Sequence, residues 1–406
     1  MKLTRRLLRP FSSVLAHKLE HYACMQPSSL SMQEYIDIGR KETATASFVF
    51  VRNELLVRLA NIMKEMTFLP AKLLSMPSVG RVTNWYYQSF EDLLYFENAD
   101  VDCSTVNTFN DQLQVIMKRH SDVVKTMAAG LLELKNAGGI SMSREPSIQY
   151  FLDRLYTNRI SKRMLQNQHL VVFGSMLPKS PHHIGYIDPA CDVAGVIKTA
   201  FFDARYLCDI HYKVSPGLRL KCINSLNPGK MIRVVSVPSH LYHVMFELFK
   251  NAMRATVEFN PDTDSDELPL VEVTVVSGRH DLSVKITDRG GGFPRTNLGR
   301  MFNFMYSTAP SPILRNDSEP AMAGYGYGLP LSRLYTRYFL GDLVLAPLEG
   351  YGTDAHVYLK AIPFEAAEVL PIYSNSSRQQ LTTSIETNDW SHHLPDHGCH
   401  RSDLRV

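Results

Sequence analysis

The first half of the chain has the hydrophobic spacing of α-helices. Between residues 31 and 173, apolar side chains recur at intervals of three and four, as expected for one face of a helix. The clearest case is SFVFVRNELLVRLANIMKEMTFLP, whose apolar file is Val51, Leu55, Leu59, Ile62 and Met66. Residues 109–134 and 148–173 repeat the pattern, and prolines and a Gly-Gly pair interrupt it. The spacing predicts three or four long helices with short connections, which is typical of a helical bundle.

In the second half the period changes from that of helices to that of strands. One helix is expected over residues 191–212. Residues 269–292 then alternate apolar and polar side chains around a turn at Gly278, and residues 341–362 do the same. These two segments predict β-hairpins. Helices combined with antiparallel strands indicate an α+β domain behind the helical one.

The helix predicted for HVMFELFKNAMRATVE has an unusual polar face. His243, Glu247, Lys250, Asn251 and Arg254 follow one another at three- and four-residue spacing, opposite a wholly apolar side. An amide oxygen is a suitable Mg²⁺ ligand, the cations can offset phosphate charge, and a carboxylate can accept a proton. The plain alternative is a solvated face of i,i+4 ion pairs.

Two glycine-rich segments and a Gly-Thr pair follow that helix. DRGGG, at the end of a predicted strand, offers the Asp288 carboxylate to an exocyclic amine, and its glycines permit a close backbone approach. GYGYGLPLSR precedes a helix, so free N–H groups and the helix dipole favour an anion there. GTDA adds the Thr353 hydroxyl. Each feature alone is common, and their order and spacing are not.

The order of these motifs resembles the Bergerat-type ATP site of the GHKL superfamily, which includes gyrase, Hsp90, histidine kinases and MutL. No Walker A, HRD or DFG sequence occurs, so the machinery of ordinary protein kinases is missing. More narrowly, the chain resembles the mitochondrial pyruvate dehydrogenase kinases. That likeness rests on QYFLDRLYTNRIS, NQH, ELFKNAMRATVE, DRGGGFP, MYSTAP, GYGYGLPLSRLYTRYF and EGYGTDAHVYLKA, in this order.

The resemblance implies a fold, a reaction and partners. A four-helix bundle (26–178) precedes a GHKL α/β-sandwich ATP-binding domain (179–372), and a tail (373–406) follows. The γ-phosphoryl group of ATP is transferred to serines of the pyruvate dehydrogenase α subunit, with Mg²⁺ and, as a further cation, K⁺. The lipoyl domain of the acetyltransferase core and a second copy of the chain are the expected partners, and the mitochondrial matrix is the expected location.

The resemblance also implies roles for individual residues. Glu247 is the general base with His243 as its partner, Asn251 holds Mg²⁺, and Lys250 and Arg254 contact phosphates. Asp288 binds the adenine amino group, with Gly290, Gly292 and Thr353 around the base. The lid and the phosphate site are framed by Ser307, Thr308, Gly324, Tyr325, Gly326, Tyr327, Gly328 and Leu329.

Three further sites follow from the likeness. The first is a regulatory pocket for pyruvate-like acids, formed by Tyr87, Arg119, His120 and Arg159; an arginine beside a histidine is a credible carboxylate clamp. The second is a lipoyl groove at Leu30, Tyr35, Ile38 and Phe50. The third is the Asp389-Trp390 pair of the tail, expected to dock on a dimer partner because a tryptophan in a polar tail needs a place to bury its ring.

Composition indicates a cellular location and argues against several classes of protein and site. Residues 1–25 contain no acid before Glu20 and carry arginines opposite leucines, which is typical of a mitochondrial presequence; a frayed basic helix of the mature protein is the alternative. A net charge of +3 argues against a dedicated nucleic-acid binder, and no apolar run is long enough to span a membrane. Six scattered cysteines without a CxxC pair favour a reducing compartment and indicate no zinc site.

Other functions remain open at this stage. A kinase of the branched-chain 2-oxoacid dehydrogenase would share fold and nucleotide site. A histidine autokinase would need an exposed phosphoacceptor, for which His120 is the one contender; a buried, hydrogen-bonded histidine is the plainer interpretation. A non-kinase GHKL ATPase of the Hsp90 or MutL sort would carry a long middle domain that this chain lacks.

Overall fold

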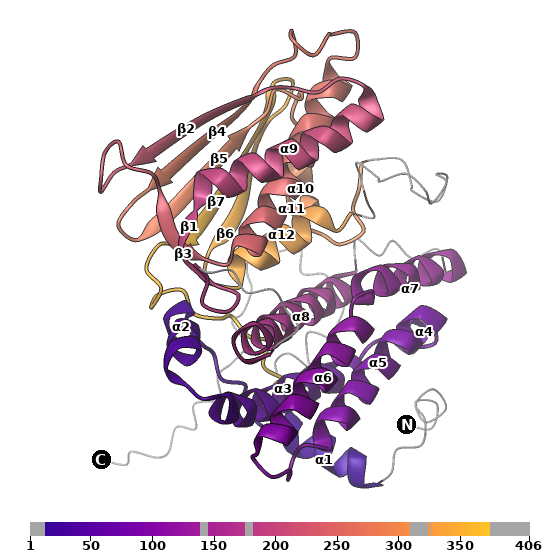
Figure 1. The fold of residues 1–406 in the computed structure, drawn as a ribbon. Coiled ribbons are helices and arrows are strands. Elements are labelled where there is room, and N and C mark those ends of the chain that lie inside the picture. The colour runs from indigo at the N-terminus through magenta and orange to yellow at the C-terminus, as the bar shows by residue number, and fades with distance from the viewer. Residues whose placement is uncertain (1–12, 139–144, 175–181, 309–323, 325, 374–406) are drawn as a thin grey trace, which may run out of the picture.

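The computed structural model describes residues 13–138, 145–174, 182–308, 324 and 326–373. Figure 1 shows two parts, a helical part in the first half of the chain and an α+β part in the second, packed against each other. The predicted division between helical and mixed halves is therefore confirmed. The predicted boundary at 178/179 lies outside the described residues, as do the tail residues Asp389 and Trp390.

The helical part packs its long helices around one core. Ser31 begins the second helix with a capping box to Glu34. The side chains of Thr43 and Asp102 cap two of the long helices by accepting a backbone N–H three residues on, which satisfies an N–H group that a helix start leaves free. Phe90, Phe109, Leu131 and Phe151 meet in its interior. The helices are α1 (Ser13–Ala23), α2 (Met32–Lys41), α3 (Ala44–Met66), α4 (Ala71–Leu74), α5 (Pro77–Leu94), α6 (Cys103–Arg119), α7 (Val123–Gly138) and α8 (Pro146–Phe173).

Helix α1 belongs to this packing, which bears on the predicted presequence. Leu19, Tyr22 and Ala23 are buried against the helical core, and Glu97 pairs with Lys18 at 2.7 Å and with the Tyr22 hydroxyl at 2.8 Å. A cleavable leader reaching residue 25 would remove these contacts. The alternative interpretation, a basic helix of the mature protein, fits residues 13–23, and residues 1–12 lie outside the described chain.

The α+β part is built on a five-stranded sheet. The strand order is β2-β4-β5-β7-β6, in which β2 and β4 are parallel and the other pairs antiparallel. Both predicted hairpins are confirmed, as β4–β5 and β6–β7. The strands are β1 (Asp188–Asp192), β2 (Leu218–Asn224), β3 (Arg233–Ser236), β4 (Val271–Ser277), β5 (Asp281–Thr287), β6 (Asp342–Leu348) and β7 (Gly352–Lys360), and β1 pairs with β3 apart from the sheet.

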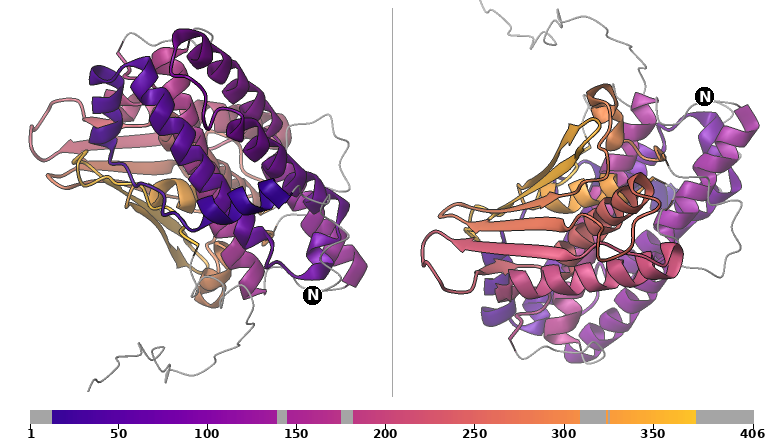
Figure 2. Two further views of the ribbon diagram at one scale, coloured as in Figure 1. Left: turned by 90° about the horizontal axis from the view of Figure 1, so that it is seen from below. Right: turned by 90° about the horizontal axis from the view of Figure 1, so that it is seen from above.

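Three helices cover one face of this sheet (Figure 2). They are α9 (Val193–Tyr212), α10 (Pro238–Phe259) and α12 (Gly328–Arg337), and α10 contacts both of the others. The apolar residues that alternate along the strands, such as Val273, Val284 and Val357, point into this layer and are buried. Short pieces, η3 (Arg295–Asn297) and α11 (Leu298–Met301), follow β5. Helix α12 also contacts α8 and so joins the two halves.

A buried ion pair ties the halves together near the end of the described chain. Glu368 accepts hydrogen bonds from Nη2 of Arg58 at 2.7 Å and Nη1 at 3.1 Å, from the Leu30 amide at 3.1 Å, and from the hydroxyls of Tyr35 and Tyr338. The side chains of Arg58 and Glu368 are 1% and 0% exposed. Breaking such a pair on one side strands a charge in the interior, so we expect this contact to hold α2, α3 and α12 in one arrangement.

Among the described helices, none combines the length and the apolar composition that crossing a membrane requires.

Replacing Arg58 by methionine leaves Glu368 buried without its counter-ion. We expect the free energy of unfolding to fall by about 3 kcal/mol, which lowers Tm by roughly 3–4 °C for a chain of this length, measured by scanning calorimetry on the full chain. The matched control is Arg219→Met, which breaks an exposed pair with Glu272 and should change Tm little. The double variant Arg58→Met/Glu368→Leu should recover only part of the loss, because Glu54, which also pairs with Arg58 at 3.1 Å, then stays buried without its counter-ion. An unchanged Tm for Arg58→Met alone would contradict the role given to this pair.

Candidate active site

Helix α10 presents its polar residues to a cavity beside the start of α12. Nζ of Lys250 lies 2.8 Å from Oε1 of Glu247. Asn251 is exposed to the cavity, and no hydrogen bond to another described residue holds its amide away. The phosphate-side cavity is lined by Glu247, Lys250, Asn251, Arg254, Met301, Tyr306, Ser307, Thr308, Gly324, Gly326, Gly328, Leu329 and Pro330.

A larger cavity of about 440 Å³ continues from it toward the sheet. Its walls are Leu248, Ile286, Phe293 and Leu345 together with Asp288, Gly290, Gly292 and Thr353. Asn251, Arg254 and Leu329 are among the residues that line both cavities, so the two form one elongated site. An apolar end that holds the Asp288 carboxylate and a polar end at a helix start match a purine base and its phosphates; the second lining acid, Glu258, is paired with Arg254 at 2.9 Å.

Asp288 is fixed at the apolar end. Its Oδ1 accepts hydrogen bonds from the amides of Gly290 at 2.9 Å and Thr353 at 3.2 Å, which tie the carboxylate to β7. Burial raises the pKa of Asp288 to about 6, against the smaller lowering by these two backbone hydrogen bonds. At neutral pH the group is a carboxylate able to accept from an amine.

Two glycines permit the close approaches that shape the site. A Cβ on Gly290 would lie 2.6 Å from the carbonyl carbon of Ala255 and 2.8 Å from the amide of Thr256, so DRGGG packs directly on the backbone of α10. A Cβ on Gly328 would overlap Oε2 of Glu247, so the start of α12 lies directly against that carboxylate.

His243 lies one turn before Glu247. Its Nε2 is buried and has no hydrogen-bond partner among the described residues, and its ring packs on Tyr335 at 4.8 Å between centroids. Burial lowers the pKa of His243, and the charge of Glu247 opposes that shift. The imidazole is therefore neutral at physiological pH.

The structure places three of the predicted ATP contacts differently from the rest or leaves them outside the description. Tyr327 points away from the cavity: its side chain is 8% exposed and packs on Phe304 and Tyr156 of the helical part. In this position the ring packs on other aromatic side chains and not on a nucleotide. Arg254 lines the cavity but pairs with Glu258 at 2.9 Å. Tyr325 is not among the described residues.

Sequence reasoning missed a side chain from the helical part that shapes the lid base. The Gln149 amide of α8 donates to the Phe304 carbonyl at 3.2 Å and accepts from the Phe304 amide at 2.7 Å. The next residue, Met305, has φ of 63° and donates to the Gly326 carbonyl at 3.2 Å. Gln149 thereby fixes the backbone that leads to Ser307 and Thr308. No short motif signals a contact across 155 residues.

The predicted regulatory pocket is only partly assembled. His120 is 6% exposed and its Nε2 bonds the Ser89 hydroxyl at 2.9 Å, so the plainer interpretation of a buried, hydrogen-bonded histidine is confirmed. Arg159 lies at the pocket, but Arg119 is held by Asp92 at 2.6 Å. Tyr86, not Tyr87, packs on the His120 ring at 4.6 Å, because one residue along a helix turns a side chain by about 100°.

The predicted lipoyl groove also needs correction. Tyr35 is 1% exposed and bonds Glu368, and Leu30 is buried beside it, so neither faces a partner. Ile38 and Phe50 are half-buried.

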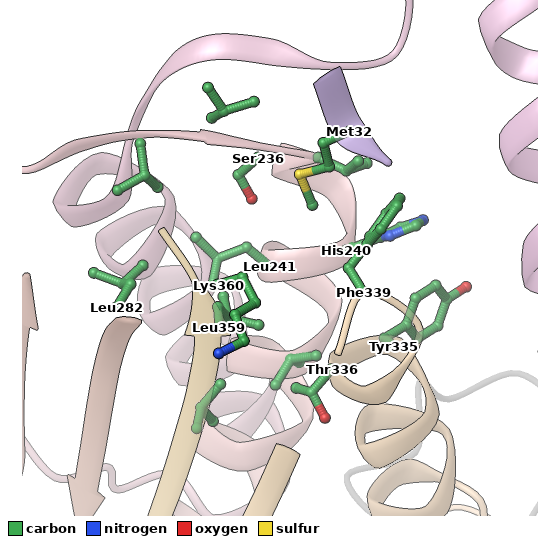
Figure 3. Close-up of a pocket in the computed structure, with 15 residues that line it drawn as sticks. Met32, Ser236, His240, Leu241, Leu282, Tyr335, Thr336, Phe339, Leu359 and Lys360 are labelled. Atoms are coloured by element: carbon green, nitrogen blue, oxygen red, sulfur yellow. The ribbon is translucent and has the colours of Figure 1, made fainter. Parts of the chain in front are cut away.

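A separate small cavity of about 30 Å³ lies where α2 meets the α+β part (Figure 3). Figure 3 shows Met32 of α2 above His240 and Leu241 of α10, with Tyr335 of α12 and Phe339, just after that helix, beside them. Its size and apolar lining exclude a nucleotide.

Comparison with known proteins agrees with the division of the chain into a helical half and an α+β half. Residues 29–188 match the family model of the mitochondrial branched-chain alpha-ketoacid dehydrogenase kinase, and residues 236–363 match the histidine kinase-, DNA gyrase B- and HSP90-like ATPase model. These matches, with the elongated cavity, define the class: a mitochondrial-type protein kinase with a GHKL nucleotide domain.

Full-length relatives narrow the class to one family. A [pyruvate dehydrogenase (acetyl-transferring)] kinase of Ascaris suum is 62% identical over 398 residues, covering 98% of this chain and 99% of its own. A probable kinase of the same name from Caenorhabditis elegans is 60% identical, with 98% of both chains covered, and human isozyme 3 is 48% identical, with 96% of both. The chain belongs to the family of mitochondrial pyruvate dehydrogenase kinases.

The raised pKa of Asp288 predicts a pH dependence of nucleotide binding. Because the group is a carboxylate above about pH 6 and protonated below it, ATP affinity should fall as pH decreases from 7.5 to 5.5. Asp288→Asn is the matched variant, since it keeps the shape and cannot titrate; its pH profile reports the ionisation of ATP alone. Calorimetric titration of both proteins measures the difference. Superimposable profiles would contradict a role for Asp288 in binding the base.

The contact of Gly328 with Glu247 predicts a loss of rate on adding one methyl group. Gly328→Ala should displace the carboxylate and lower phosphate transfer by roughly 10- to 100-fold. Gly299→Ala, in α11 with no neighbour within 4 Å of the added Cβ, is the control and should transfer phosphate normally. Steady-state assays compare them, and equal loss in both would refute the steric explanation.

Proposed function

We propose that the protein transfers the γ-phosphoryl group of ATP to serines of the pyruvate dehydrogenase α subunit and thereby inactivates the complex. The observation that carries this proposal is the file Glu247, Lys250 and Asn251 on α10, exposed to the cavity whose far end holds Asp288. The pyruvate dehydrogenase kinases that align with 98% of this chain support the choice of substrate.

Each residue of this row on α10 has a role in the reaction. The adenine amine donates to Asp288, and the phosphates extend along α10 toward the N–H groups at the start of α12. The serine hydroxyl attacks the γ-phosphorus, the bond to the bridging oxygen breaks, and ADP leaves. Glu247 takes the proton of the hydroxyl. Lys250, already beside Glu247, offers its ammonium group to the phosphate charge.

A metal ion fits this site through the nucleotide. Among the described residues there is no group of three His, Cys, Asp or Glu side chains that would hold a metal alone. An amide such as that of Asn251 with phosphate oxygens is a donor set that Mg²⁺ accepts. Magnesium, when bound, neutralises charge on the phosphates; K⁺ as a second cation rests on the family likeness alone.

The remaining assignments extend the proposal. We place the protein in the mitochondrial matrix, with a leader that ends before Ser13 because α1 is packed in the fold. We propose that α3, α5, α6 with α7, and α8 are the four helices of the bundle. A homodimer through Asp389 and Trp390, and contact with a lipoyl domain near Ile38 and Phe50, follow from the family.

The branched-chain 2-oxoacid dehydrogenase is the second candidate substrate. The model matched by residues 29–188 carries that name, and the two kinases share this nucleotide site. A histidine autokinase is disfavoured because His120 is buried. A GHKL ATPase without a protein substrate would use the same carboxylate on water, and its mark would be ATP turnover without phosphate transfer to any protein.

Substituting the proposed base tests the reaction. Glu247→Gln should lower serine phosphorylation by at least about 100-fold, since proton removal is lost, while ATP binding is kept. The assay combines purified dehydrogenase, the acyltransferase core and radiolabelled ATP. Asn251→Ala is the companion variant and should lose Mg²⁺-dependent ATP binding as well. Equal transfer by parent and Glu247→Gln would remove Glu247 from the base role, and faster labelling of the branched-chain substrate would reassign the enzyme.

A further inference from the structure

The segment that follows β5 forms part of the nucleotide cavity and has no buried core of its own. Its two short helices, η3 and α11, are three and four residues long, and no residue within either is buried. Helices of this length are not stable in water by themselves. Met301, the last residue of α11, nevertheless lines both the phosphate-side cavity and the larger cavity that reaches Asp288. The position of this wall must therefore be fixed by contacts from other elements.

The residue after Met301 is the point at which α12 holds this segment. Phe302 is half-buried, and Cζ of Arg333 lies 4.4 Å from the centroid of its ring. A guanidinium group at this distance from an aromatic face is attracted to the ring and covers it from solvent. Two residues further on, the backbone of Phe304 is held by Gln149 of α8. The segment is thus fixed by one contact from α12 and by a second from the helical part.

Arg333 is itself oriented by an acid. Its Nε lies 3.3 Å from Oδ1 of Asp342, the first residue of β6. Arg337, one turn further along α12, donates from its own Nε to the same oxygen at 2.8 Å. The two arginines therefore share a counter-ion, and of these two described side chains only Arg333 lies over an aromatic ring. Comparing them separates the contact with Phe302 from the pairing with Asp342.

We propose that Arg333 is a positioning residue for the nucleotide: by holding Phe302 it keeps Met301 at the junction of the two cavities. This rests on the nucleotide site of the proposed function and names a residue behind its wall that sets its affinity. Arg333 is not among the described residues that line either cavity, so it acts through α11 and not on the ligand. Without the ring contact Met301 is free to move, and nucleotide binding must then order it, which weakens binding.

The contact should act on nucleotide affinity and not on the transfer step. Glu247 and Lys250 belong to α10, whose distance from its neighbours is set at Gly290 and Gly328 and does not depend on Phe302. Once the nucleotide is bound, the proposed base and the phosphate contacts are in place. A less ordered wall therefore raises KM for ATP and leaves kcat unchanged, which is the signature of binding energy used equally in the ground state and the transition state.

Calorimetric titration of the full chain with ADP and Mg²⁺ tests the proposal on two matched variants. Arg333→Met and Arg337→Met each lose one pairing with Asp342, and only the first loses the contact with Phe302. Arg333→Met should raise the Kd for ADP by about fivefold, the size of one partly exposed cation–π contact. Arg337→Met should bind ADP as the parent does. In the transfer assay Arg333→Met should raise KM for ATP by a similar factor and keep kcat within about twofold of the parent.

A double-mutant cycle tests whether Phe302 mediates the effect. Phe302→Leu removes the aromatic face and keeps an apolar side chain, so it should weaken ADP binding as Arg333→Met does. The double variant Arg333→Met/Phe302→Leu should bind no more weakly than either single variant, because both changes remove the same contact. Circular dichroism and Tm confirm that each variant is folded.

Four results would overturn the proposal: unchanged ADP binding by Arg333→Met, an equal loss in Arg337→Met, additive losses in the double variant, or a parent protein that binds no ADP. Calorimetry with ADP requires no phosphate transfer, so the two claims fail separately. A parent that binds ADP and labels no dehydrogenase refutes the kinase assignment alone. Normal labelling together with any of the first three results refutes the role of Arg333 alone.

Discussion

The site depends on how closely two backbone segments approach helix α10. At one end DRGGG lies on Ala255 and Thr256, and at the other the first residue of α12 lies against Glu247. At Gly290 an added Cβ would meet the backbone of α10, which is why glycine stands there; at Gly328 an added Cβ would meet the Glu247 carboxylate and displace it. Between these contacts α10 is held at a fixed distance from the sheet and from α12. Its exposed amide and carboxylate therefore point along one cavity instead of into solvent.

The helical part contributes to that cavity without lining its phosphate end. Gln149 holds the backbone of Phe304, and Tyr327 inserts its ring among Phe304 and Tyr156, so both edges of the lid are anchored to α8. The Arg58–Glu368 pair fixes α3 and α12 relative to each other in the same interface. A shift of α8 or α3 would therefore move the start of α12 as well.

Much of the fold followed from periodicity. The alternation around Gly278 gave the β4–β5 hairpin, and the three- and four-residue spacing gave α3, α8 and α10, because these patterns report burial directly. Asp288, Asn251 and the glycines could be placed because motif order fixes them on one surface. Tyr327 and Tyr35 could not be placed from sequence. Whether an aromatic side chain beside a motif is exposed or buried depends on a neighbour that is distant in sequence. Gln149 was missed for the same reason, since its partner Phe304 lies 155 residues further along the chain.

The central claim is that Asn251 of α10 holds the metal of a nucleotide lying between Asp288 and Gly328. A crystal structure of the full chain with Mg²⁺ and a non-hydrolysable ATP analogue measures this directly. The account predicts the Asn251 amide oxygen at about 2.0–2.1 Å from the metal, with the adenine amine at Asp288. A bound nucleotide whose metal has no contact with Asn251, or a base placed away from Asp288, would contradict it.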